Sequence, residues 1–150
     1  MSTPTATAGR AGKAAAAYSA SVATLERRFI AFLESGTVPE GLFADDVFLD
    51  LTLPQWRLQA TGPDELLTVR RGGHPSSGKV PRWRTDVFED GFVIEFEETW
   101  QADGQQWYCR EMGRADVADG VITALSLYCT GDWDAGQQAR HRREVPLVRP

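Results

Sequence analysis

Apolar residues recur at helical spacing near the start of the chain. Five of them follow one another at steps of three and four: Val22, Leu25, Phe29, Phe32 and Leu33. This spacing places them on one face of a helix that Gly36 can end. The segment before it, residues 1–17, is small and polar, which is typical of a disordered lead. We therefore expect the folded domain to begin at residue 18, with the helix lying against another apolar surface.

A hairpin and two further helical segments are predicted before the middle of the chain. Residues 39–43 predict a short helical turn. The β-rich runs 47–53 and 56–60 are separated by Pro54 and Gln55, which predicts a hairpin. The next helix opens at residues 62–64 with proline at its first position, and residues 70–73 end it with two arginines and two glycines.

The second half of the chain predicts strands. Residues 82–88, 91–100, 106–117 and 121–130 carry strand patterns, and the last three are separated by the tight-turn dipeptides Asp103-Gly104 and Asp119-Gly120. A final helix, capped by Asp132 or Asp134, should run through Arg142 and end before Pro146. The order predicts an α+β domain over residues 18–143, in which a curved antiparallel sheet wraps the helices, followed by a tail over residues 144–150.

Hairpin pairing predicts which side chains point inward in the last two strands. A two-residue turn at Asp119-Gly120 places Tyr128 opposite Glu111 and Thr130 opposite Cys109. Alternate residues of the strand 107–117 fall on opposite faces of the sheet. The set that includes Cys109 and Glu111 is the more apolar of the two. We therefore expect Glu111 and Tyr128 to point inward together, with Cys109 and Thr130 beside them.

The preceding strand carries three carboxylates, Glu95, Glu97 and Glu98. A two-residue turn at Asp103-Gly104 pairs Glu97 with Arg110 on the outer face, and the inward residues are then Ile94, Phe96, Glu98 and Trp100. A three-residue turn with a bulge would reverse the faces and bury Glu95 and Glu97. Burying two uncompensated carboxylates costs several kcal/mol, which favours the two-residue turn.

The same register predicts an apolar patch on the convex face of the sheet. Its members would be Leu125, Leu127 and Cys129, beside Tyr108 and Met112. An exposed patch of this kind suggests a homodimer through the outer face, although a packed tail would cover it equally well.

Composition excludes several classes of protein. A chain of 150 residues with 42% hydrophobic content is long enough for one domain. The formal net charge of -5 is the wrong sign for a nucleic-acid partner. Two cysteines without CxxC spacing predict neither a disulfide scaffold nor a metal site. No export signal and no run of about 18 apolar residues is present, so we expect a cytoplasmic protein without a membrane partner.

The order of elements resembles the SnoaL-like branch of the nuclear-transport-factor-two-like superfamily over about residues 20–140. The residues that carry the likeness are Phe43 to Asp50, Thr61 to Asp64, Asp119 to Ile122 and Tyr128 to Asp134. The resemblance implies a cone-shaped α+β barrel with an internal pocket. It does not imply one activity, since the fold hosts isomerases, cyclases, epoxide hydrolases, dehydratases and binding proteins.

The catalytic acids of the better-known members have no direct counterparts in this chain. At the positions that limonene-epoxide-hydrolase-like enzymes use, the chain carries Glu97, Thr99 and Thr130, none of which matches. The aspartate of ketosteroid-isomerase-like members corresponds most nearly to Asp50, which falls one residue short and is a candidate only if a bulge turns it inward.

Glu111 and Tyr128 form the pair most suited to chemistry. A carboxyl group in an apolar pocket has a raised pKa and can act as an acid or base near neutral pH, while a phenol can donate to a developing oxyanion. The alternative is a buried structural hydrogen bond, or a contact of Glu111 with Arg57 or Arg84. His74, in a loop rich in glycine and serine, could edge the pocket mouth; a plain exposed histidine is the alternative.

An aromatic and polar pocket wall completes the predicted site. Its candidate substrate-binding residues are Trp56, Trp83, Phe96, Glu98, Trp100, Trp107, Cys109 and Thr130. The tryptophans could equally be plain core. The sequence thus predicts an enzyme without cofactor or metal that acts on a small apolar molecule, polyketide-like or terpenoid-like, by isomerisation, cyclisation, dehydration or epoxide opening. A non-catalytic binding domain on the same scaffold is the alternative.

Overall fold

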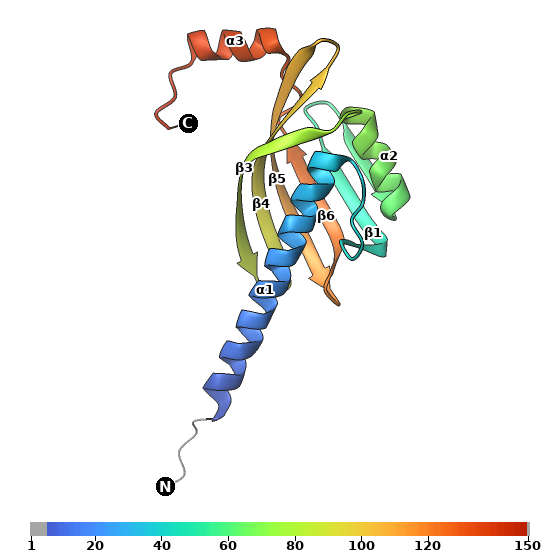
Figure 1. Cartoon of the computed structure of the whole chain (residues 1–150), viewed down its shortest axis with the longest axis vertical. Coiled ribbons are helices and arrows are strands. Elements are labelled where there is room, and N and C mark those ends of the chain that lie inside the picture. The colour runs from blue at the N-terminus through green and yellow to red at the C-terminus, as the bar shows by residue number, and fades with distance from the viewer. Residues whose placement is uncertain (1–5, 150) are drawn as a thin grey trace.

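One mixed sheet and three helices make up the part of the chain that the structure describes (Figure 1). The computed structural model describes residues 6–149, with side chains from residue 15 onward. The helices are α1 (Ala6–Ser35), α2 (Pro63–Gly73) and α3 (Ala135–Glu144). The strands are β1 (Phe43–Thr52), β2 (Arg57–Thr61), β3 (Gly78–Phe88), β4 (Gly91–Ala102), β5 (Gln105–Ala118) and β6 (Val121–Cys129).

The strands lie in the order β2-β1-β6-β5-β4-β3. All neighbours are antiparallel except β1 and β6, which run parallel because the chain returns to place its last strand beside its first. The sheet curves around α1 and α2 (Figure 1), which confirms the predicted α+β architecture. It is not antiparallel throughout, and it does not close into a barrel, since β2 and β3 remain as opposite edges.

The apolar face of α1 fills the concave side of the sheet. All five residues of the predicted helical stripe are buried, each at 2% exposure or less: Val22, Leu25, Phe29, Phe32 and Leu33. Phe29 meets Phe96 of β4 edge to face, with ring centroids 5.8 Å apart. The predicted face of this helix is therefore confirmed.

Two boundaries near the N-terminus differ from the prediction. The structure places residues 6–17 in α1, whereas the sequence predicts a disordered lead there; residues 1–5 of that lead lie outside the described residues. The alanine run 14–17 has high helix propensity and can continue a helix that is anchored further along. The helical turn predicted at residues 39–43 is wrong: β1 begins at Phe43, and Gly41 has a φ of 73°, which an α-helix does not permit.

The hairpin between β4 and β5 has the predicted register. Phe96 pairs with Glu111, and Glu97 pairs with Arg110. Asp103 and Gly104 have φ values of 53° and 73°, as a two-residue turn of type I′ requires. Glu98 therefore points inward and is 3% exposed, while Glu97 lies on the outer face.

The register of β5 with β6 differs from the prediction by one residue. Glu111 pairs with Cys129, and Tyr128 pairs with Met112. The tight turn itself is as predicted, but Val117 pairs with Ile122 while Asp116 pairs with Ala124, so that Thr123 is an extra residue in β6. Every later side chain of β6 then points to the opposite face.

This bulge changes the composition of both faces of the sheet. Leu125 and Leu127 are buried on the inside, so the outer patch predicted from them and Cys129 is wrong. Tyr128, expected inside, is 62% exposed on the outer face. Phe48 and Met112 are the other large apolar side chains exposed there.

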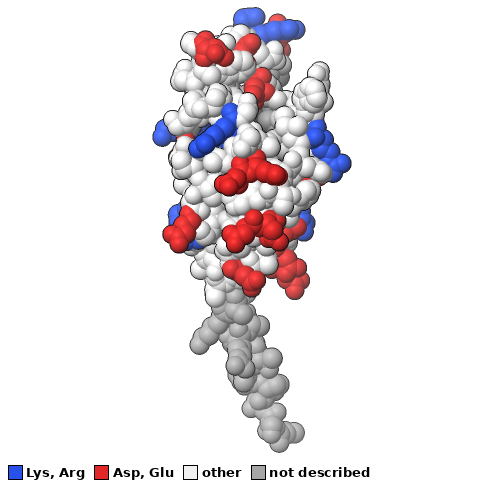
Figure 2. All heavy atoms as spheres, turned by 90° about the vertical axis from the view of Figure 1, so that its right-hand side faces the viewer, with Lys and Arg blue, Asp and Glu red and all other residues white. Residues whose placement is uncertain are grey.

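Negative charge is concentrated on the side of α2 and β1. Figure 2 shows acidic side chains gathered over the middle and lower parts of this face. The exposed acids at the start of these two elements are Asp45, Asp46, Asp64 and Glu65. Such a surface repels phosphate groups. Among the described helices, none is long and apolar enough to cross a membrane.

Candidate functional site

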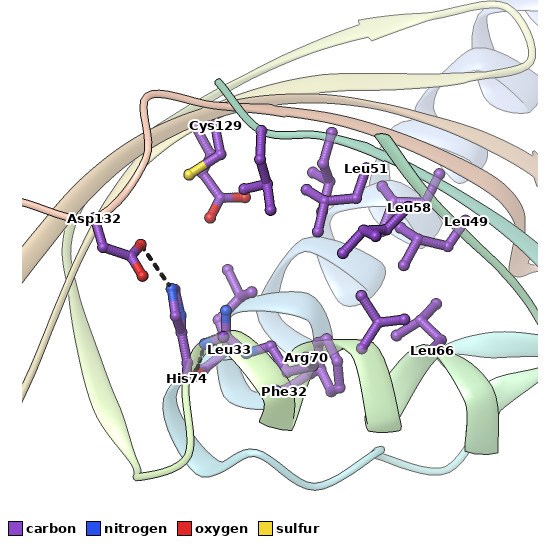
Figure 3. Close-up of a pocket in the computed structure, with 17 residues that line it drawn as sticks. Phe32, Leu33, Leu49, Leu51, Leu58, Leu66, Arg70, His74, Cys129 and Asp132 are labelled. Carbon is purple, nitrogen blue, oxygen red and sulfur yellow. Dashed lines mark hydrogen bonds and ion pairs between the residues drawn. The ribbon is translucent and has the colours of Figure 1, made fainter. Parts of the chain in front are cut away.

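A cavity of about 330 Å³ lies between the concave face of the sheet and the helices α1 and α2 (Figure 3). Most of its wall is apolar and comes from five elements and the β1–β2 turn: Phe32, Leu33, Leu49, Leu51, Leu53, Leu58, Leu66, Val69, Leu125 and Leu127. Alternation along β1 explains part of this wall, since Leu49 and Leu51 point to the same side of the strand. The cavity is large enough for a small organic molecule.

The polar groups of the cavity converge at one end. Figure 3 shows Arg70 of α2, His74 directly after this helix, Cys129 at the end of β6 and Asp132 just beyond it. Glu111 of β5 also lines the cavity. An apolar wall with a few convergent polar groups is the usual composition of a small-molecule site.

Glu98 is held as an anion behind this polar end. Arg70 donates from Nη1 to Glu98 Oε2 at 2.9 Å and from Nη2 to Glu98 Oε1 at 2.5 Å, and Nη2 also donates to the carbonyl oxygen of Leu33 at 2.7 Å. Burial acts to raise the pKa of Glu98, but His74 and Arg70 outweigh it and lower the pKa to about 2. The pair fixes α2 against β4.

His74 lies between two carboxylates. Its Nδ1 is 3.4 Å from Glu98 Oε2 and its Nε2 is 3.5 Å from Asp132 Oδ1, and the side chain is only 8% exposed. The ring stacks on Trp100, with centroids 3.9 Å apart. Burial acts to lower the pKa of His74, but the contacts with Asp132 and Glu98 outweigh it and raise the pKa. His74 therefore stays protonated to higher pH than an exposed histidine does.

Glu111 lines the cavity next to His74. Burial, followed by the charge of Glu98, raises the pKa of Glu111 well above the ordinary value of a glutamate. One nitrogen of His74, one oxygen each of Glu98 and Glu111, and the sulfur of Cys109 all lie within 4.8 Å of one another. Two proton-exchanging groups with displaced pKa values thus face the same end of the cavity.

Two thiols lie beside these groups. The Cys109 thiol donates to Glu111 Oε1 at 3.5 Å, and the backbone N–H of Gly131 donates to Cys129 Sγ at 3.3 Å. The contact with Cys109 is the main cause that lowers the pKa of Cys129 to about 7, and the same contact, with burial, raises the pKa of Cys109.

The structure brings some of the predicted site residues together. Glu111 and His74 line the cavity, and His74 is not the exposed loop residue that was the alternative. Glu98, Trp100 and Cys109 contact them from behind. Trp107 stacks on Trp100, and Phe96 belongs to the core around Phe29.

Other predicted site residues do not line the cavity. Tyr128 faces outward because of the bulge in β6, and Thr130 lies beyond the strand, where its hydroxyl accepts from the backbone N–H of Arg110. Trp56 is 69% exposed, and Trp83 is 45% exposed, with its indole N–H donating to Glu26.

Asp50 also lies outside the site. Its neighbours Leu49 and Leu51 point into the cavity, and no bulge follows Phe48 in β1, so Asp50 faces outward. Arg57 donates to its two carboxylate oxygens at 2.9 and 2.6 Å, and this hydrogen bonding is the main cause that lowers the pKa of Asp50.

Three polar residues of the site were not predicted from the sequence. Arg70 is one helical turn after the buried Leu66, and this spacing is a signal that could have placed it on the inner face of α2. Cys129 depends on the bulge in β6, for which the sequence carries no clear signal. Asp132 was considered only as a helix cap, a role that Asp134 has, since it accepts from the backbone N–H of Gln137.

Several solved structures share this fold at low sequence identity. An NTF2-like protein from Anabaena variabilis gives a TM-score of 0.62 at 17% identity, over 77% of this chain and 93% of its own. A candidate polyketide cyclase from Xanthomonas campestris gives 0.57 at 17% identity, over 72% and 89%. A candidate isomerase from Rhodopseudomonas palustris gives 0.57 at 15% identity, over 73% and 88%.

No family model and no curated protein matches the sequence. The three-dimensional likeness nevertheless shows that the chain has the NTF2-like fold, as the resemblance in the sequence implied. The fold alone does not determine an activity.

Proposed function

We propose that the chain is an enzyme that binds a small apolar molecule in the cavity and transforms it by proton transfer, without a cofactor. The observation that supports this most is an apolar cavity that ends at two buried proton-exchanging groups, Glu111 and His74, within 4.8 Å of each other. Isomerisation, cyclisation, dehydration and epoxide opening all need such a pair, one group to give a proton and one to take it.

The environments of both groups favour the protonated form, and the two can still take different roles. Glu111 keeps its proton to higher pH than an exposed glutamate, so it can donate to an oxygen of the substrate. His74 loses its proton only above its raised pKa, and its neutral ring can then take a proton from the substrate at the same end of the cavity. The carboxylates of Glu98 and Asp132 then stabilise the imidazolium that forms, as a carboxylate does for histidine in hydrolytic triads. Tyr128, expected as the hydrogen-bond donor, has no part in this scheme.

The substrate class follows from the wall of the cavity. Leucine side chains from β1, β2, α2 and β6 surround the space, which favours a carbon skeleton with few polar groups, such as a polyketide-like or terpenoid-like intermediate. Two of the proteins with similar structures are described as a candidate polyketide cyclase and a candidate isomerase. Their descriptions agree with this chemistry by analogy of fold only.

Deuterium exchange tests proton transfer without knowledge of the natural substrate. The chain, treated with a chelator, would be incubated in D₂O with a panel of small apolar ketones and enones, and deuterium at the carbon next to the carbonyl would be measured by NMR. We expect exchange with the wild type, and a loss of about 100-fold or more in Glu111→Gln and His74→Gln, since a positioned acid or base contributes roughly 10²- to 10⁴-fold. Glu97→Gln, on the outer face, is the matched control and should keep full exchange.

A non-catalytic binding domain is the rival function. It is favoured by the Arg70–Glu98 pair, in which a buried acid is already neutralised and has a structural role. If panel members bind and stabilise the fold but show no exchange above the Glu111→Gln and His74→Gln background, the binding function stands and the enzyme proposal fails.

A further inference from the structure

Two thiols and a carboxylate converge where β5 and β6 meet the polar end of the cavity. The sulfur atoms of Cys109 and Cys129 and one carboxylate oxygen of Asp132 all lie within 4.8 Å of one another. Cys109 is fully buried in β5, whereas Cys129 and Asp132 line the cavity (Figure 3). The group is therefore closed on the side of the sheet and open toward the cavity.

The backbone holds Cys129 and Asp132 in this arrangement. Gly131, between them, has a φ of 82°, and a side chain there would come within 2.9 Å of Pro54. This turn directs Asp132 back toward the sulfur of Cys129. The N–H of Gly131 donates to that sulfur at 3.3 Å, and a hydrogen bond of this kind favours the thiolate, which is the form that binds metals.

Among the residues whose side chains the structure describes, two overlapping groups could supply metal ligands, and the charges around the two groups differ. The group of His74, Glu98, Cys109 and Glu111 lies equally close together, but Arg70 donates to both oxygens of Glu98 and brings its positive charge to that position. A cation bound there would have to displace or oppose the guanidinium. Arg70 donates to Glu98 and to the carbonyl oxygen of Leu33, and to no atom of Cys109, Cys129 or Asp132.

His74 supports the second group without being one of its ligands. Its Nε2 lies 3.5 Å from Asp132 Oδ1, so the imidazole orients the carboxylate. Two thiolates and one carboxylate carry three negative charges, which exceed the two positive charges of a divalent ion by one.

We propose that Cys109, Cys129 and Asp132 together bind one thiophilic divalent metal ion, Zn²⁺ in preference to Mg²⁺ or Ca²⁺, with its fourth position open to the cavity. Sulfur ligands select zinc over the harder cations, and three protein ligands with one open position form a familiar tetrahedral zinc arrangement. Binding would release the thiol protons to solvent. The sequence predicted no metal site because Cys109 and Cys129 lack CxxC spacing; the pairing of β5 with β6 brings them together. The proposal does not depend on the acid–base function.

Cobalt substitution tests this site directly. The full chain, reduced and freed of metal with a chelator, would be titrated with Co²⁺ under anaerobic conditions. We expect one equivalent to bind with near-ultraviolet thiolate-to-cobalt absorption and the visible bands of tetrahedral Co²⁺, and one equivalent of Zn²⁺ to remove both. If the reduced wild type develops no thiolate–cobalt absorption, the proposal is wrong.

Variants then identify the ligands. The variants Cys129→Ser and Cys109→Ser should each lose the thiolate absorption. Cys109 is fully buried and Cys129 is half-buried, so Cys129→Ser remains informative if Cys109→Ser does not fold. His74→Ala should weaken binding about 10- to 100-fold, as loss of a group that orients a ligand does. Asp132→Asn should weaken binding at least as much, and its matched control is Asp119→Asn, since asparagine also suits that distant tight turn. Unchanged absorption in both cysteine variants would overturn the assignment.

Discussion

The ion pair of Arg70 with Glu98 joins α2 to β4, and both side chains are largely buried. The side chains are 12% and 4% exposed. Removing one partner leaves the other charged and unpaired, and this typically costs roughly 3–5 kcal/mol. Arg70→Met should therefore lower the free energy of unfolding by about that amount in urea denaturation, and the double variant with Glu98→Met should recover most of the loss.

The exposed pair of Arg82 with Glu97 provides the matched control. Its two atoms are 2.9 Å apart, but the arginine side chain is 50% exposed. A pair of this kind contributes about 0–1 kcal/mol, so Arg82→Met should change the free energy of unfolding little. If Arg70→Met costs no more than Arg82→Met, the buried pair does not hold α2 in place.

Glu111 makes stability depend on pH. Its folded pKa lies above the ordinary value of 4.5, so its contribution to stability is complete below pH 4.5 and is lost as the pH rises through the folded pKa. Glu111→Gln keeps the shape of the protonated acid but cannot ionise. The difference in free energy of unfolding, variant minus wild type, should therefore grow in favour of the variant above pH 4.5, by at most about 1.4 kcal/mol per pH unit.

Denaturation series between pH 4 and 9 would measure this difference. The exposed Glu40→Gln is the control, and its difference from the wild type should stay flat. A flat difference for Glu111→Gln as well would mean that the carboxyl group is solvated in the folded chain, and the acid role proposed for it would lose its basis.

At the scale of the elements, one extra residue decides how much of the site the sequence predicts. The β4–β5 hairpin has no bulge, so the inward placement of Glu98 follows directly from the turn and strand alternation. In β6, Thr123 is accommodated as the bulged residue, with its hydroxyl donating to the carbonyl oxygen of Asp116 at 3.2 Å. Threonine is a common residue in regular strands, so Thr123 gives no signal of a bulge, and the prediction placed Tyr128 and Cys129 on the wrong faces.

Gly91 is a point where β4 and β5 approach too closely for a side chain. A Cβ atom there would lie 2.0 Å from the carbonyl oxygen of Ala115 and 2.8 Å from the ring of Phe88. Gly91→Ala should therefore destabilise the fold by about 1–3 kcal/mol or more, as overpacking does. In α2, Gly72 has no atom within 4 Å of the same position, and Gly72→Ala should stabilise by about 0.4–1 kcal/mol.

Thermal and chemical denaturation of the two glycine variants would be compared side by side. Opposite signs are expected, since the two substitutions are chemically identical and differ only in the space around them. A Gly91→Ala variant as stable as the wild type would show that the strands can separate to admit a methyl group.

At the scale of the whole molecule, the site depends on packing between segments that are distant in the sequence. The order of helices and strands was sufficient to predict the fold class. It could not predict that the C-terminal end of α2 would lie over β4 and the end of β6, where Arg70 meets Glu98 and His74 meets Asp132. Such contacts depend on how a helix lies across a sheet, which strand alternation does not define.

The convex face of the sheet presents a group of exposed apolar side chains that a partner would bury. Phe48, Met112 and Tyr128 are 41%, 49% and 62% exposed, and Met112 pairs directly with Tyr128 across β5 and β6. Met112 was predicted on this face, whereas Leu125 and Leu127 of the predicted patch are buried on the inside and Phe48 and Tyr128 were not expected here. We propose that two copies of the chain associate through it, as a self-complementary two-fold contact.

Sedimentation velocity at several concentrations tests this association. We expect the wild type to sediment as a dimer and Met112→Glu to sediment as a monomer, because the substitution places a charge in the apolar contact. Val87→Glu is the control: Val87 is 46% exposed, but it lies in the edge strand β3 and pairs with the buried Phe92, so it faces the concave side. A wild type that stays monomeric, or a Val87→Glu variant that dissociates equally, would exclude the convex face as the dimer contact.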